Sequence, residues 1–135
     1  MSNPLSKKLG IKEGYSLVLH NQPKDYWMYF DLLPDNLKQL DAEEAVHETI
    51  DFVHAFCTTQ LDLNVFRDEL KPLIHEKGMI WISWPKKTSS LSSEISRDQI
   101  REFGLSIGLV DVKVASINED WSGVKFVYRL KDRKS

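Results

Sequence analysis

The sequence predicts a small three-layer α/β domain whose sheet is mostly parallel and ends in a C-terminal antiparallel hairpin. Short, nearly all-apolar segments alternate with segments of helical periodicity, which is typical of parallel strands covered by helices on both faces. Near the C-terminus, two segments instead alternate apolar and polar residues, as hairpin strands with one solvated face do. We expect one domain over residues 1–130 and a polar tail at 131–135.

The first half of the chain contains two expected strands and a helix. The segment "YSLVLHN", residues 15–21, is apolar enough for a strand buried on both faces. In "KDYWMYFDLL", residues 24–33, apolar side chains recur at helical spacing, which predicts a helix that Pro34 ends. The segment "NLKQLD", residues 36–41, is a weaker candidate for the second strand.

Two similar apolar segments, "IDFVHAFC" at 50–57 and "GMIWISW" at 78–84, are the expected third and fourth strands. Between them, residues 61–78 place apolar side chains on one helical face, which predicts a helix. Gly78 is its expected C-terminal stop, and Pro72 is expected to kink or divide it.

The last part of the chain predicts a helix followed by the hairpin. In "SRDQ", Ser96 and Gln99 form a capping box that begins the helix. Residues 109–117 and 124–130 alternate apolar and polar side chains, and "NEDWSG" at 118–123 links them.

Composition limits the classes of protein that the chain can represent. With 135 residues, of which 41% are hydrophobic, it can bury a core without disulfides or metals. The formal net charge of −2 argues against a nucleic-acid coat or a membrane-surface protein, because both usually carry a basic excess. Cys57 is the only cysteine and indicates a buried thiol and a reducing compartment. No apolar run approaches the ~20 residues needed to cross a bilayer, and no signal peptide is evident, so a cytoplasmic location is expected.

The expected strand order places a ligand at one edge of the sheet. Right-handed crossovers favour a Rossmann-like layout with strand one central, strand two on one side, and strands three and four on the other. In such sheets, ligands bind beyond the carboxyl ends of the strands, where the winding changes direction. The segments expected at this edge are His20 to Pro23, Asp41, Thr58 to Thr59, Trp84 to Lys87, and the hairpin turn with Asp120 to Ser122.

The predicted ligand-binding residues at this edge are Asn21, Trp84, Lys86, Lys87 and Trp121. In "SWPKKTSS", residues 83–90, the lysines and hydroxyls can hold a phosphate or a carboxylate. The alternative is a solvated loop in which Trp84 packs on a helix. Trp121 is either an aromatic platform for a ligand or a residue that packs beneath the turn.

Catalytic and metal-binding patterns are missing from the sequence. No pair of the four histidines has zinc-site spacing, and no nucleophile elbow or P-loop motif is present. His20, after the first strand, is the histidine to test as an acid or base, and a hydrogen-bonded packing role is its alternative. No catalytic residue, metal or cofactor is assigned.

Three segments carry a resemblance to a known family: "KLGIKEGYSLVLHNQP" at 8–23, "LIHEKGMIWISWPKKTS" at 73–89 and "GLVDVKVASINEDWSGVKFV" at 108–127. They resemble the bacterial domain-of-unknown-function family 3052, and the resemblance runs from about Lys8 to Tyr128. That family implies no activity.

The order of elements is also similar to that of class I S-adenosylmethionine-dependent methyltransferases. The resemblance to these enzymes implies a Gly-rich turn after strand one for the cofactor's methionine moiety and an acid after strand two for its ribose. Here the turn reads "LHNQPKDY", without glycine, and Asp41 is the candidate acid.

The sequence therefore favours a non-catalytic binding or regulatory module on a methyltransferase-like scaffold. The alternative is an enzyme or receptor for a small anionic or nucleotide-like ligand at the carboxyl edge of the sheet. A protein partner also fits the first interpretation. A third interpretation, which the acidic chain as a whole opposes, is contact with nucleic acid through the C-terminal cations Lys125, Arg129, Lys131, Arg133 and Lys134.

Overall fold

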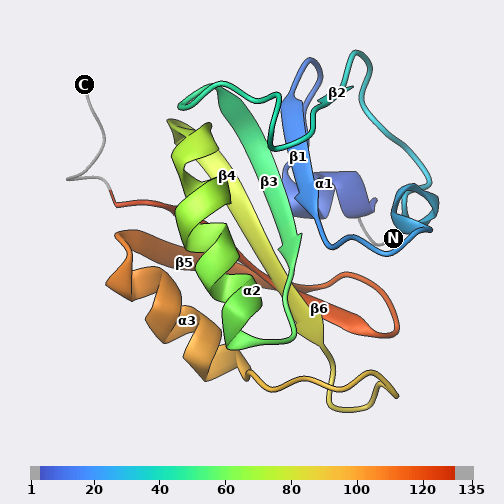
Figure 1. The fold of residues 1–135 in the computed structure, drawn as a ribbon. Coiled ribbons are helices and arrows are strands. Elements are labelled where there is room, and N and C mark those ends of the chain that lie inside the picture. The colour runs from blue at the N-terminus through green and yellow to red at the C-terminus, as the bar shows by residue number, and fades with distance from the viewer. Residues whose placement is uncertain (1–3, 130–135) are drawn as a thin grey trace.

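The computed structural model describes residues 4–129 and contains a six-stranded sheet in the order β2-β1-β3-β4-β6-β5 (Figure 1). β1 is parallel to β2 and β3, and β3 is parallel to β4, whereas β6 is antiparallel to both β4 and β5. The predicted fold class is confirmed, and so is the placement of the first strand between the second strand on one side and the third and fourth on the other. The elements in chain order are α1 (Leu5–Leu9), β1 (Ser16–His20), η1 (Tyr26–Tyr29), β2 (Lys38–Gln39), β3 (Ile50–Phe56), α2 (Gln60–Val65), η2 (Phe66–Leu70), η3 (Lys71–Leu73), β4 (Ile74–Pro85), α3 (Arg97–Ser106), β5 (Leu109–Ser116) and β6 (Trp121–Tyr128).

Apolar layers cover both faces of the sheet. Figure 1 shows α2 and α3 in front of the sheet and α1 behind it. Leu17 and Val18 are neighbours in β1, are both 0% exposed, and belong to the two different layers. Complete burial of one such side chain contributes about 1.5–3 kcal/mol, so β1 stabilises both layers. The predicted strand buried on both faces is confirmed.

The helix predicted over residues 24–33 is wrong in its length and type. Only Tyr26–Tyr29 is helical, as a 3-10 turn, and Phe30 is already extended. The rings of Tyr26, Trp27 and Phe30 pack on one another at centroid distances of 5.1 to 5.6 Å. Met28, on the turn between them, is 84% exposed. These aromatic residues have the spacing of one face of a helix, but their rings pack on one another within a single 3-10 turn, and no longer helix forms.

The helix predicted over residues 61–78 ends earlier than expected. α2 continues into a π-helical and then a 3-10 segment that contains Pro72, and β4 begins at Ile74. Gly78 is therefore a strand residue and not a helix stop. A Cβ atom at Gly78 would lie 2.6 Å from Ile74 Cγ2 and 3.0 Å from the Ile50 carbonyl oxygen, at the irregular pairing of β3 with β4. The glycine is needed because the two strands approach closely there.

The C-terminal helix and hairpin are present as predicted, but the alternation in β5 does not give a buried apolar face, because Val112 is 53% and Val114 is 45% exposed. Ser96 Oγ accepts a hydrogen bond from the Gln99 backbone N–H (3.3 Å), and Gln99 Oε1 accepts one from the Ser96 N–H (2.8 Å), so the capping box is confirmed. β6 begins at Trp121, three residues before its predicted start at 124. The predicted tail at 131–135 lies outside the described residues.

Candidate functional site

The carboxyl end of β4 and the β5–β6 hairpin lie at the same edge of the sheet, as predicted. Trp84 pairs with Ser122 and Pro85 pairs with Trp121. Because β5 and β4 are both antiparallel to β6, the hairpin turn opens beside the end of β4. The Lys86 N–H donates a hydrogen bond to the Asp120 carbonyl oxygen (2.8 Å), which continues this pairing past the strand.

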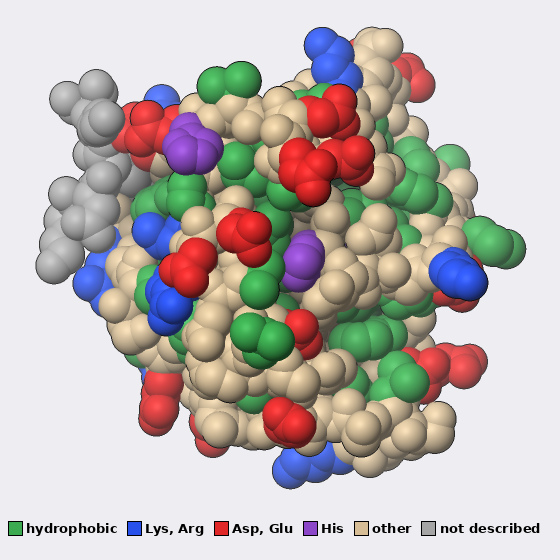
Figure 2. Space-filling model, viewed as in Figure 1, with side chains coloured by type: hydrophobic (Ala, Val, Ile, Leu, Met, Phe, Trp, Pro, Cys, Tyr) green, Lys and Arg blue, Asp and Glu red, His purple; other side chains and the backbone are tan. Residues whose placement is uncertain are grey.

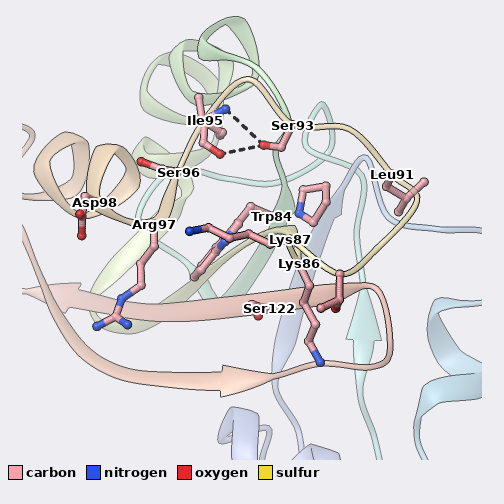
Figure 3. Close-up of a pocket in the computed structure, with 12 residues that line it drawn as sticks. Trp84, Lys86, Lys87, Leu91, Ser93, Ile95, Ser96, Arg97, Asp98 and Ser122 are labelled. Carbon is pink, nitrogen blue, oxygen red and sulfur yellow. Dashed lines mark hydrogen bonds between the residues drawn. The ribbon is translucent and has the colours of Figure 1, made fainter.

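A pocket of about 680 Å³ lies beyond the end of β4, bordered by the 86–96 loop, the first turn of α3 and β6 (Figure 3). Trp84 forms part of its wall and is only 9% exposed. Lys86, Lys87 and Arg97 supply three cations to the lining, whereas Asp98 supplies one carboxylate. The pocket is therefore locally cationic in a chain whose formal net charge is −2.

The two neighbouring lysines point in different directions. Lys86 Nζ donates a hydrogen bond to Ser116 Oγ (2.6 Å), and Figure 3 shows this side chain directed toward the hairpin. Lys87 extends the opposite way, across Trp84 and toward the side of α3. Lys87 is exposed and forms no side-chain hydrogen bond or ion pair with residues 4–129. Of the two, Lys87 is the one whose charge is available to a ligand.

Hydrogen bonds hold the loop that borders the pocket against the sheet. Ser89 Oγ donates to Asp120 Oδ1 (2.8 Å), near the start of the loop. The Glu94 N–H donates to the Thr58 carbonyl oxygen (2.8 Å), near its end. Ser93 Oγ bonds to both the N–H and the carbonyl oxygen of Ile95. The wall of the pocket is therefore tied to the ends of two different strands.

Asn21 and Trp121 lie at the same edge but not in the lining of this pocket. Asn21 has a left-handed backbone (φ 56°), and its Nδ2 donates to the Phe56 carbonyl oxygen and to Asp62 Oδ1, both at 3.3 Å. Trp121 meets the ring of Phe56 edge to face, with centroids 4.9 Å apart. The structure thus brings Trp84, Lys86 and Lys87 together and leaves the other two predicted residues outside.

Arg97 is a pocket residue that sequence reasoning did not include. Its position directly after the predicted cap Ser96, and close in sequence to the hydroxyl-rich loop, was the available signal. Figure 3 shows its guanidinium leaving the first turn of α3 toward the β5–β6 ribbon, whereas Asp98 lies on the far side of that turn from Trp84.

A second polar group, which the sequence did not indicate, is buried in the layer beneath α1 and η1. Tyr26 Oη is 2.9 Å from His54 Nδ1, and His54 Nε2 is 2.7 Å from Ser83 Oγ. All three residues are at most 1% exposed. Burial lowers the pKa of His54 to about 3, so its ring is neutral and serves as both donor and acceptor. This arrangement satisfies the polar groups and has no access to a substrate.

The other side chains considered for chemistry among the described residues, Cys57 and His20, are buried or partly buried. Cys57 is buried, as predicted, and burial, followed by the nearby Asp62 carboxylate, raises the pKa of its thiol to about 12. His20 lies at the end of β1 and is partly buried. Within residues 4–129, no group of three His, Cys, Asp or Glu side chains is placed to hold a metal ion. No helix in this part of the chain is long and apolar enough to cross a membrane.

Charged side chains are dispersed on the face that carries α2 and α3. Figure 2 shows Lys and Arg side chains scattered among Asp and Glu, without a broad field of positive charge over the described residues of this face. Of the cations considered for nucleic-acid contact, Lys131, Arg133 and Lys134 lie outside the described residues. Arg129, the last residue described, donates from its guanidinium to the Leu105 carbonyl oxygen at the end of α3.

Comparison with known proteins identifies the fold. No family model matches the chain, and no curated protein matches its sequence. A solved S-adenosylmethionine-dependent methyltransferase from Aquifex aeolicus is similar in structure, with a TM-score of 0.62 and 16% identity over 89% of this chain and 85% of that one. A 1,6-didemethyltoxoflavin-N1-methyltransferase from Burkholderia thailandensis has a TM-score of 0.61, with 9% identity over 92% of this chain and 74% of that one. A TehB-like methyltransferase from Corynebacterium glutamicum has a TM-score of 0.55, with 8% identity over 87% and 82%.

At these identities, the similarity concerns the fold and not the activity. The resemblance to the domain-of-unknown-function family 3052 stays a prediction, since no family model matches. The chain has the Rossmann-like fold of the S-adenosylmethionine-dependent methyltransferases.

Proposed function

We propose that this chain is a non-catalytic binding or regulatory module built on a methyltransferase-like scaffold. The observation that carries the proposal is the Asn21 bridge at the crevice between β1 and β3. In the order β2-β1-β3-β4, the winding changes direction between β1 and β3, which is where this architecture binds its ligand. The Asn21 amide spans this position and is held by the end of β3 and by Asp62.

The turn after β1 does not fit S-adenosylmethionine. The resemblance to methyltransferases implies a Gly-rich turn there, because a backbone without side chains can approach the cofactor closely. Residues 21–25 contain no glycine. The candidate ribose acid, Asp41, is exposed, and its backbone is engaged in a local turn in which the Asp41 N–H donates to Glu44 Oε1 (3.1 Å).

The reactive side chains also support a role without catalysis. Ser83 and His54 contact each other as a nucleophile and base would, yet both are 0% exposed. Cys57 is protonated at neutral pH because burial raises its pKa to about 12. A substrate would have to open the core to reach any of these groups.

Calorimetric titration of the purified protein with S-adenosylmethionine and S-adenosylhomocysteine tests this proposal. We expect no saturable binding at millimolar ligand, and no transfer of a labelled methyl group to small-molecule or protein acceptors. The matched variant is Asn21→Gly, which removes the bridge and supplies a residue that adopts φ 56° without strain. Micromolar binding by the wild-type chain, together with methyl transfer, would show that the scaffold is an active enzyme.

A second candidate function is a receptor for a small anionic ligand, and the pocket beyond β4 favours it. Its size, about 680 Å³, is within the usual range of small-molecule sites, roughly 300–1,000 Å³. Its three cations outnumber its single carboxylate. A thermal-shift screen of phosphorylated and carboxylated metabolites tests this function: a ligand at ten times its Kd should stabilise the fold by ~1.4 kcal/mol.

A further inference from the structure

Two cations of the pocket beyond β4, Lys87 and Arg97, form no side-chain hydrogen bond or ion pair with residues 4–129. Lys87 and Arg97 are exposed, line the pocket, and have no ion-pair partner among residues 4–129. The nearest carboxylate in the lining, Asp98, lies on the far side of the first turn of α3 (Figure 3). Elsewhere, Arg67 and Arg101 each pair with an aspartate, at 2.8 and 3.1 Å. Both pocket cations are therefore free to pair with an anionic group of a ligand.

Some hydroxyl groups of the pocket form hydrogen bonds within the protein, and others are available to bind a ligand. Ser93 bonds to Ile95, and Ser96 caps α3. Thr88 and Ser122 line the pocket without a side-chain hydrogen bond to the described residues. Two cations and two hydroxyls from separate segments of the chain are thus open to an acceptor-rich group.

An apolar wall adjoins these polar groups. Trp84, at the end of β4, and Leu91, which is 45% exposed, both line the pocket. The Trp84 ring is fixed from behind, because it belongs to the core layer beneath α2 and α3. A fixed indole edge or face favours contact with a flat organic body.

We infer that this pocket binds a phosphate group carried on a small planar organic body, such as a nucleoside monophosphate. Lys87 and Arg97 hold the phosphate, Thr88 and Ser122 donate to its remaining oxygens, and Trp84 contacts the planar part. A phosphate fits this set better than a carboxylate, because it offers three acceptor oxygens to cations and hydroxyls that approach from different segments. The inference deepens the receptor function proposed above and depends on it.

Titration calorimetry with AMP, adenosine and inorganic phosphate tests the site. AMP should bind, with an affinity that decreases as salt is added because the phosphate contacts are charged. Adenosine, which lacks the phosphate, should bind at least about tenfold more weakly. The indole N–H resonance of Trp84 should shift when AMP is added, since the planar part lies against this ring.

The variants Lys87→Met and Arg97→Met each remove one cation and keep most of the side-chain stem. Each should weaken AMP binding at least about tenfold, which corresponds to the loss of one charge-assisted hydrogen bond. The matched control is Lys77→Met, an identical change at an exposed lysine near the start of β4, outside the pocket lining. It should change AMP affinity less than about twofold, and all three variants should melt as the wild type does because the residues are at the surface.

Several outcomes would overturn the inference. One is the absence of saturable binding of AMP and phosphate to the wild-type chain, and another is equal weakening by Lys77→Met and Lys87→Met. Equal affinity for AMP and inorganic phosphate would remove Trp84 from the site. These results are separate from those of the S-adenosylmethionine titration, because that cofactor's expected place depends on the Asn21 turn and not on Lys87 or Arg97.

Discussion

At the scale of single residues, His54, which is hydrogen-bonded to Tyr26 and Ser83 in the core, makes the stability of the fold depend on pH. Burial lowers the pKa of His54 to about 3 in the folded protein, from about 6.5 in the unfolded chain. Between these values the unfolded chain binds more protons, so the free energy of unfolding falls as the pH falls, by up to about 1.4 kcal/mol per pH unit. Above about pH 6.5 the contribution is constant because His54 is neutral in both states.

His54→Gln removes the titrating ring and should flatten the stability profile between about pH 6.5 and 5, measured by urea unfolding. The control is His47→Gln, the same change at an exposed histidine, which should keep the wild-type slope. At neutral pH, His54→Gln should also lower the free energy of unfolding by about 1–3 kcal/mol. The His54 ring stacks on the Phe56 ring, with centroids 4.4 Å apart, and forms two hydrogen bonds. Equal slopes in both variants would contradict the assignment to His54.

At the scale of elements, the contact between α3 and β6 depends on a glycine. A Cβ atom at Gly104 would lie 2.7 Å from Phe126 Cζ, and both residues are buried. Helix propensity alone would make Gly104→Ala stabilising by about 1 kcal/mol. Overpacking of a buried contact costs about 1–3 kcal/mol, so we expect a net loss of up to about 2 kcal/mol in the free energy of unfolding.

Chemical denaturation of Gly104→Ala measures the sign of this effect. Glu102→Ala, at an exposed position of the same helix, carries no packing conflict and should stay within about 0.5 kcal/mol of the wild type. A stabilising Gly104→Ala would mean that α3 lies farther from β6 than the structure places it.

The elements that were predictable from the sequence are those defined by local chemistry. The capping box of Ser96 and Gln99 and the pairing of β5 with β6 depend on neighbours along the chain or across one hairpin. The apolar alternation in β5 does not correspond to burial, because Val112 is 53% and Val114 is 45% exposed. The sequence-based predictions are wrong where contacts between residues that are far apart in the sequence determine the local structure. The Tyr26 turn is fixed by His54, 28 residues away, and Gly78 is fixed by the approach of β3.

The same distinction applies at the scale of the whole molecule and to the candidate site. Strand ends placed Trp84, Lys86 and Lys87 at the carboxyl edge, because a parallel sheet brings all such ends together. The opposite directions of the two lysines follow from the Ser116 hydroxyl, 30 residues from Lys86, and no local pattern contains that information. Arg97 joins the pocket through the packing of α3 on the sheet, which is likewise a tertiary property.

The segment that follows α1 lies against the β5–β6 hairpin, and several lysines lie at this contact. Lys113 Nζ donates to the Lys8 carbonyl oxygen (2.9 Å) at the end of α1, and Lys125 Nζ lies 3.5 Å from where a Cβ of Gly10 would be. Burial, followed by repulsion from Lys113 and Lys12, lowers the pKa of Lys125. Like charges therefore oppose the docking of α1 on the C-terminal hairpin.

Lys12→Glu replaces one repulsive charge with an attractive one and should raise the free energy of unfolding by about 0.5 kcal/mol at low salt. The gain should shrink at about 1 M salt, where the screening length is about 3 Å. Lys38→Glu is the matched control, because Lys38 is an exposed lysine on the opposite edge strand, β2. It should give no gain, since adding negative charge to a chain of net charge −2 brings no general benefit. Equal effects of the two changes in thermal unfolding would show that charge repulsion does not limit the contact between this segment and the hairpin.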